Sequence, residues 1–173
     1  MCQACVLLRP AVRSCVEAIE AMLEYPCVYT GPNTVFDSVD ASGSPTVLNY
    51  VVRFTHYNAI MYKFEFPVLT HAMVYLSALQ SNDPAHQITW ANFHRLFAAA
   101  FCVAYKFVED RPPGDKWLAE MSGMSRRELV RLEMVALRCL DYRLLIGPTE
   151  FEQVARKWGH IRKKTLTDQP ISL

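Results

Sequence analysis

An unbroken apolar run from Leu96 to Tyr105 constrains this chain more than any other feature. Arg95 and Lys106 bound the run on its two sides. Crossing a bilayer takes about 20 apolar residues, so the run is too short to be a membrane span. A helix that is apolar on nearly every side must instead be surrounded by other protein elements. The run therefore predicts a central, buried helix in an all-α protein.

Helix-start signals place two helices before this central one and two after it, between Pro45 and Asp141. Capping residues and proline are typical of the first positions of a helix. Glycine at position 123 suits the left-handed end of the fourth helix. The expected starts are Ser44 followed by Pro45 for the first helix, Pro67 for the second, Thr89 for the third, Asp115 for the fourth, and the capping box Ser125 with Glu128 for the fifth.

One further amphipathic helix is expected on each side of these five. Apolar residues recur at helical spacing from Val12 to Leu23 and again from Phe151 to Trp158. The predicted organisation is an N-terminal flanking helix over 1–25, a linker over 26–44, a five-helix unit over 45–147, and a short C-terminal helix with a polar tail over 148–173. A chain of 173 residues is long enough for one such core.

The composition favours a protein partner over other kinds of ligand. The net charge is about +1, which gives no electrostatic reason to expect nucleic acid or a membrane surface. The six cysteines are scattered, and no second pair follows Cys2 and Cys5 at zinc-site spacing. We assign no metal, no cofactor and no small-molecule substrate. The absence of a leader-like segment and the cysteine usage predict an intracellular location, in the nucleus, the cytoplasm or both.

The second half of the chain resembles the cyclin box, in particular that of the phosphate-pathway or P/U-type cyclins. The resemblance rests on His94-Arg95-Leu96 at the start of helix three, on Ala104 to Phe107 at its end, on the turn that ends at Gly123, and on Glu128 to Glu133. It implies a single five-helix cyclin box with flanking helices. It also implies a non-enzymatic subunit that binds and activates a cyclin-dependent kinase.

Two charged residues carry most of the functional expectation. In cyclins, a lysine and a glutamate at the positions of Lys106 and Glu133 bind backbone groups of the kinase beside its mobile regulatory helix. The apolar neighbours of Glu133 on its own helix leave it no partner there. A carboxylate in an apolar stripe needs a partner, so the alternative is a structural ion pair with a neighbouring helix, for which Lys106 itself is one candidate.

The resemblance also implies an apolar pocket beside this pair for a side chain of the kinase. Any one of its residues could equally be an ordinary core residue. Trp117, on the short fourth helix, is expected to be structural. The pocket residues are Val103, Phe107, Leu137, Tyr142 and Leu144.

The first half of the box departs from the family pattern. Cyclins usually carry Tyr-x-Asp-Arg late in helix two, whereas this chain has Tyr75-Leu76-Ser77-Ala78. Arg53 matches the arginine that normally pairs with the missing acid, so its structural role is open. The competing interpretation of the whole chain is a cyclin-fold transcription adaptor, like transcription factor IIB, that has no kinase partner. Salt-sensitive DNA binding would favour it.

Overall fold

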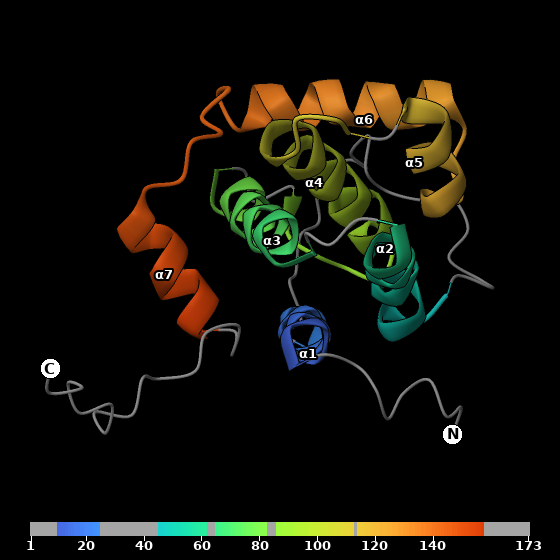
Figure 1. The fold of residues 1–173 in the computed structure, drawn as a ribbon. Helices are drawn as coiled ribbons and strands as arrows, with labels where there is room; N and C mark the ends of the chain where they lie inside the picture. Colours follow the sequence, from blue (N-terminus) through green and yellow to red (C-terminus); the bar gives the residue numbers. More distant parts are fainter. Residues whose placement is uncertain (1–9, 25–44, 62–64, 83–85, 113, 158–173) are drawn as a thin grey trace, which may run out of the picture.

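A computed structural model describes residues 10–24, 45–61, 65–82, 86–112 and 114–157. Within these ranges the regular structure is α-helical and includes no strand, which confirms the all-α prediction. Figure 1 shows helices α2 to α6 gathered in one bundle, with α1 and α7 on its outside. The helices are α1 (Pro10–Glu24), α2 (Val47–Met61), α3 (Glu65–Asn82), α4 (Phe93–Val108), α5 (Asp115–Ser122), α6 (Arg126–Cys139) and α7 (Pro148–Lys157).

Helix α4 is the centre of the bundle, as the apolar run predicts. Every residue from Leu96 to Tyr105 is buried, and Ala98, Ala99 and Ala100 are fully inaccessible. Small side chains let neighbouring helices approach closely, and α4 packs against α3, α5 and α6. This burial fixes the direction of α4 and therefore the position of the charged residue that follows the run, Lys106.

Three helix starts differ from the prediction by a few residues. Thr89 does not open α4, because its N–H donates to Asn92 Oδ1 in a turn that precedes the helix. Pro45 is not helical; α2 begins at Val47, and Thr46 Oγ1 accepts a hydrogen bond from the N–H of Asn49 at 3.3 Å. Ser44 lies outside the described residues. Asp115 is the first residue of α5 rather than its cap, which is Gly114.

A fourth start and one end also differ. Helix α3 begins at Glu65, two residues before Pro67, and α2 runs on to Met61, although the sequence pattern predicts its end near His56. Two boundary signals are confirmed. Gly123 ends α5 with a φ of 71°, the left-handed conformation that glycine tolerates best. Ser125 caps α6 by accepting the N–H of Glu128 at 3.2 Å.

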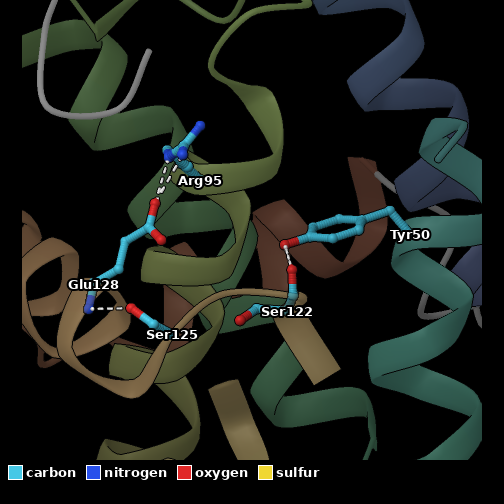
Figure 2. Close-up of polar contacts among 5 residues, drawn as sticks. All are labelled: Tyr50, Arg95, Ser122, Ser125 and Glu128. Atoms are coloured by element: carbon cyan, nitrogen blue, oxygen red, sulfur yellow. Dashed lines mark hydrogen bonds and ion pairs between the residues drawn. The ribbon is translucent and has the colours of Figure 1, made fainter. Parts of the chain in front are cut away.

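Two polar contacts connect helices of the five-helix bundle (Figure 2). The carboxylate of Glu128, on α6, does not close the expected capping box but binds Arg95 of α4, with Nη2 and Oε1 2.8 Å apart. The hydroxyl of Tyr50, on α2, donates to the carbonyl oxygen of Ser122 at the end of α5, at 3.1 Å. The ring of Tyr50 is itself buried among aromatic rings, which it meets edge-on.

The outer helices cover two different parts of the bundle, α1 next to α2 and α7 next to α3 (Figure 1). Val12, Val16 and Ile19 of α1 are buried as the sequence pattern predicts, and α1 packs on α2. The buried thiol of Cys15 lies 3.2 Å from the sulfur of Met73 on α3. Helix α7 packs on α3. The domain boundaries 1–25, 26–44, 45–147 and 148–173 stay predictions, and Trp158 lies outside the described residues.

The Tyr50 hydroxyl gives a test of this arrangement. Tyr50→Phe leaves the Ser122 carbonyl without its buried donor, so we expect a loss of about 1–2 kcal/mol in the free energy of unfolding. Tyr142→Phe deletes the same atom from an exposed ring and should change stability by less than about 0.5 kcal/mol. Urea unfolding followed by circular dichroism compares the two variants. Equal losses would show that the contact between α2 and α5 does not contribute to stability.

Candidate functional site

Lys106 connects three helices, at the end of α4, the start of α5 and the middle of α6. It lies in the last turn of α4, and its ammonium nitrogen is 2.7 Å from Asp115 Oδ1 on α5 and 2.7 Å from Glu133 Oε2 on α6. Asp115 Oδ2 also lies 3.5 Å from Arg126. A cation at a helix C-terminus and an anion in a first helical turn are both favoured by the helix dipoles. We call Lys106, Asp115 and Glu133 the charged cluster.

Lys106 and Asp115 are both stabilised in their ionised forms. Partial burial opposes the charge on Lys106, but the hydrogen bonds to Asp115 and Glu133 outweigh this and raise the pKa of the ammonium. The hydrogen bond from Lys106, assisted by the charge of Arg126, lowers the pKa of Asp115 against its partial burial. The Lys106 charge is therefore fixed over the whole physiological pH range.

Glu133 finds the partner on a neighbouring helix that its sequence context requires. Its side chain is only 12% exposed, whereas those of Asp115 and Lys106 are 26% and 30% exposed. The structural ion pair that the sequence leaves as an alternative is thus present in the unbound chain. The acids at 109 and 110, which could have paired with Lys106 along a longer helix, fall beyond the end of α4 and make no ion pair with it.

The five predicted pocket residues differ in how much surface they offer. Phe107 and Tyr142 are exposed, at 42% and 60%, and Leu137 and Leu144 are half-buried. Val103 is buried at 2% exposure and belongs to the core. Phe107 follows Lys106 on α4, and Leu137 lies one helical turn after Glu133 on α6, so the apolar side chains adjoin the charged cluster.

The turn that carries Tyr142 is strained. Two backbone bonds close α6, from the Asp141 N–H to the Arg138 carbonyl and from the Tyr142 N–H to the Leu137 carbonyl, the pattern of a Schellman motif. Asp141 and Tyr142 have φ values of 52° and 56°. Glycine is usual in this left-handed region, aspartate is tolerated there, and a bulky tyrosine is unusual. The sequence carries no signal for this conformation.

Side chains of α3 support the apolar part of the site, and sequence reasoning missed them. The Tyr75 hydroxyl donates to the Leu144 carbonyl at 2.6 Å and fixes the segment after α6. The His71 ring lies near those of Phe107 and Phe151, with centroids 6.1 and 5.6 Å away, so it links α3, α4 and α7. Burial lowers the pKa of His71, although its hydrogen bond to the Pro67 carbonyl opposes the shift.

Trp117 and Arg53, the two residues expected to be structural, differ in burial and in contacts. Trp117 is half-buried and lies against the ring of Tyr105 at a centroid distance of 6.5 Å. Arg53 is exposed on α2, and Ser77 is exposed on α3. No ion pair joins Arg53 to another residue of the described ranges, so the family's acid–arginine pair has no counterpart there.

The described residues hold no candidate metal site and no candidate membrane span. Groups of three or more His, Cys, Asp or Glu side chains that could hold a metal ion are absent from the described ranges. No helix in those ranges is long and apolar enough to span a bilayer. The arrangement of the charged cluster beside exposed rings suits the recognition of another protein.

The charged cluster predicts a pH dependence. A lowered Asp115 pKa stabilises the fold above the unfolded value of about 3.9, and this stabilisation disappears as the pH falls through the folded value. Asp115→Asn should therefore cost about 1 kcal/mol at pH 7, and the cost should disappear on acidification below the ordinary carboxyl pKa, once Asp115 is protonated in the folded protein as well. Because the pKa of Lys106 is raised, the stability difference between wild type and Asp115→Asn should persist up to about pH 9. Thermal unfolding across this range measures it.

A matched variant is Glu120→Gln, which removes an exposed carboxylate from the same helix. It should change stability little at any pH. A cost of Asp115→Asn that is independent of pH would contradict the ion pair.

Comparison with known proteins accounts for these features. A family model described as Cyclin matches residues 27–144. Cyclin-P2-1 of Oryza sativa subsp. japonica is 31% identical over 121 residues, which cover 67% of this chain and 54% of that protein. Cyclin-U4-1 of Arabidopsis thaliana is 30% identical over 102 residues, covering 59% and 49%. The chain spans about half the length of the curated relatives it matches. It belongs to the cyclin family and is of the P/U type.

Proposed function

We propose that this cyclin binds a cyclin-dependent kinase through the charged cluster and the apolar side chains beside it, and thereby activates the kinase. The observation that carries the proposal is the position of Lys106 and Glu133, 2.7 Å apart, on two helices that also present exposed rings, Phe107 next to Lys106 on α4 and Tyr142 in the turn that closes α6. Exposed aromatic side chains flanked by partly buried charges are typical of the centre of a protein interface.

The charged cluster has hydrogen-bonding capacity left for a partner. An ammonium group has three donors, and Lys106 directs two of them to Asp115 and Glu133. Glu133 uses Oε2 for Lys106, while no described residue binds its Oε1. One donor and one acceptor thus lie next to each other, which suits the carbonyl and N–H groups of a kinase backbone segment. Because the cluster is already paired, binding would order little more of it.

The backbone at Tyr142 supports the same surface. A non-glycine residue in the left-handed region costs about 1–2 kcal/mol, and strain of this kind persists where function requires it. Here the strain holds an aromatic ring 60% exposed at the end of α6. A chain optimised for stability alone would place glycine there.

The proposed mechanism supplies binding energy and no chemistry. Contact with α4 and α6 would hold the kinase's regulatory helix so that its glutamate reaches the catalytic lysine, and would help to open the activation loop. In this proposal the chain is a regulatory subunit without catalytic residues, located inside the cell where its kinase is.

Loss of the charged cluster should abolish tight kinase binding. We expect Lys106→Ala with Glu133→Ala to weaken binding at least about tenfold, because truncating a partly buried, hydrogen-bonded charge pair costs about 2 kcal/mol or more. The control removes the same residue types from the exposed surface of α5, as Lys116→Ala with Glu120→Ala, and should change affinity less than about twofold.

Calorimetry with a panel of purified cyclin-dependent kinases measures both variants, and phosphate transfer to a substrate peptide measures activation. If the wild-type chain binds no kinase, the proposed function fails. If both double variants bind alike, the function survives but this surface is the wrong one.

The strain at Tyr142 allows stability and binding to be separated. Tyr142→Ala and Tyr142→Gly both remove the ring, so both should weaken kinase binding. Only glycine relieves the left-handed backbone, so Tyr142→Gly should be more stable than Tyr142→Ala by about 1 kcal/mol. Urea unfolding and kinase affinity, measured on the same preparations, test this. Unchanged affinity in both variants would remove Tyr142 from the proposed interface.

A further inference from the structure

Helix α6 uses both of its acids in ion pairs with α4, since Glu128 binds Arg95 and Glu133 binds Lys106. Its arginines are exposed. Both negative charges of α6 are therefore paired with cations of α4, and the exposed surface of α6 carries mainly positive charge.

Three of these arginines form a row together with a methionine. Arg127, Arg131, Met134 and Arg138 follow each other at steps of four, three and four residues, which places them on one face of the helix. All four are exposed, Met134 at 42%. The row is about 16 Å long at 1.5 Å per residue. We call these four residues the arginine row.

The arginine row is not neutralised within the described part of the chain. Arg126, beside it, lies 3.5 Å from Asp115, but no ion pair or hydrogen bond to a described residue is found for the arginines of the row. Helix α6 packs on α3, α4 and α5 through its other sides. Figure 1 shows it along one edge of the bundle, with no described helix beyond it.

We propose that the arginine row binds an acidic, helical segment of a partner protein. Carboxylates spaced like the arginines, with an apolar side chain in the place opposite Met134, would match the row along its whole length. Arginine is well suited to such contacts because its guanidinium binds carboxylate or phosphate in a bidentate manner. Helix-in-groove recognition commonly uses anchors at these same helical intervals.

The methionine favours a peptide over a nucleic acid. A sugar–phosphate backbone offers charge along its length but no apolar group to cover an exposed thioether in the middle of the row, whereas flexible methionine side chains suit protein contacts. The net charge of about +1 also gives the chain no general attraction for nucleic acid.

The arginines of the row lie on a different side of α6 from Glu133. Arg131 and Arg138 lie roughly 160° and 140° around α6 from Glu133 at 100° per residue. Met134 precedes Leu137 by one turn, so this part of the row borders the proposed kinase-binding surface. The inference does not rest on the proposed function, because the arginines themselves are not part of that surface.

Fluorescence anisotropy of labelled peptides tests the proposal on the full chain. The first probe is an 18-residue helical peptide with glutamates and one leucine spaced to match the row. Others carry phosphoserine for glutamate, glutamine for glutamate, or the same residues in an order that scatters the glutamates around the helix. We expect micromolar, salt-sensitive binding of the matched acidic or phosphorylated peptide, and much weaker binding of the neutral and scattered ones. The stronger of the two anionic peptides identifies the source of the charge.

Variants locate the binding. Arg131→Glu with Arg138→Glu should weaken binding at least about tenfold. Arg13→Glu with Arg156→Glu makes the same change in net charge on exposed parts of α1 and α7 and should leave affinity within about twofold. Met134→Ser should weaken binding of the leucine peptide but not of a serine analogue. Circular dichroism confirms that each variant is folded.

Four results would each overturn the proposal. They are no saturable binding of either anionic peptide, equal binding of the matched and scattered peptides, equal losses from the two double variants, and tighter binding of a single- or double-stranded oligonucleotide than of the matched peptide.

Discussion

The burial of α4 is the constraint on which the other features depend. A helix with its residues from Leu96 to Tyr105 inaccessible to solvent cannot shift or rotate without opening the core. Its neighbours α3, α5 and α6 are therefore held in place, and so is the residue at which the apolar run stops. Lys106 comes to the surface there, between the start of α5 and the middle of α6.

The charged cluster is fully formed in the unbound chain. An unpaired lysine beside a half-buried glutamate would be costly and mobile. Asp115 shares Lys106 with Glu133 and so fixes the ammonium while leaving one donor free. The apolar side has a comparable arrangement, since Tyr75 holds the Leu144 backbone from α3 while the strained turn exposes Tyr142.

Much of this could be read from the sequence. The apolar run predicts the buried helix, the serine cap predicts the start of α6, and the resemblance to cyclins predicts that Lys106 and Glu133 adjoin. The ion pair between Asp115 and Lys106 could not be predicted from the sequence. It depends on the path of the chain between α4 and α5, which residue spacing does not reveal. The spacing of Ser125 and Glu128 predicted a local capping box, but the Glu128 carboxylate binds Arg95 on α4 instead.

The conformation of Tyr142 and the position of His71 could not be predicted from the sequence, for related reasons. Left-handed backbone is expected at glycine, so a tyrosine gives no sign of it. In the sequence nothing distinguishes His71 from the other residues of α3. Its place between Phe107 and Phe151 depends on where α7 packs. The helical pattern thus predicts the elements well, while contacts made across turns are visible only in three dimensions.

The central claim is that a kinase meets this cyclin at the end of α4 where Lys106 lies. Photo-crosslinking tests it most directly, with benzoylphenylalanine placed at Phe107 or, as a control, at the exposed Trp90 just before the start of α4. The two positions are separated by the length of α4, about 24 Å. The account predicts efficient cross-linking to a bound kinase from position 107 and little from position 90. Cross-linking from position 90 with none from position 107 would contradict it.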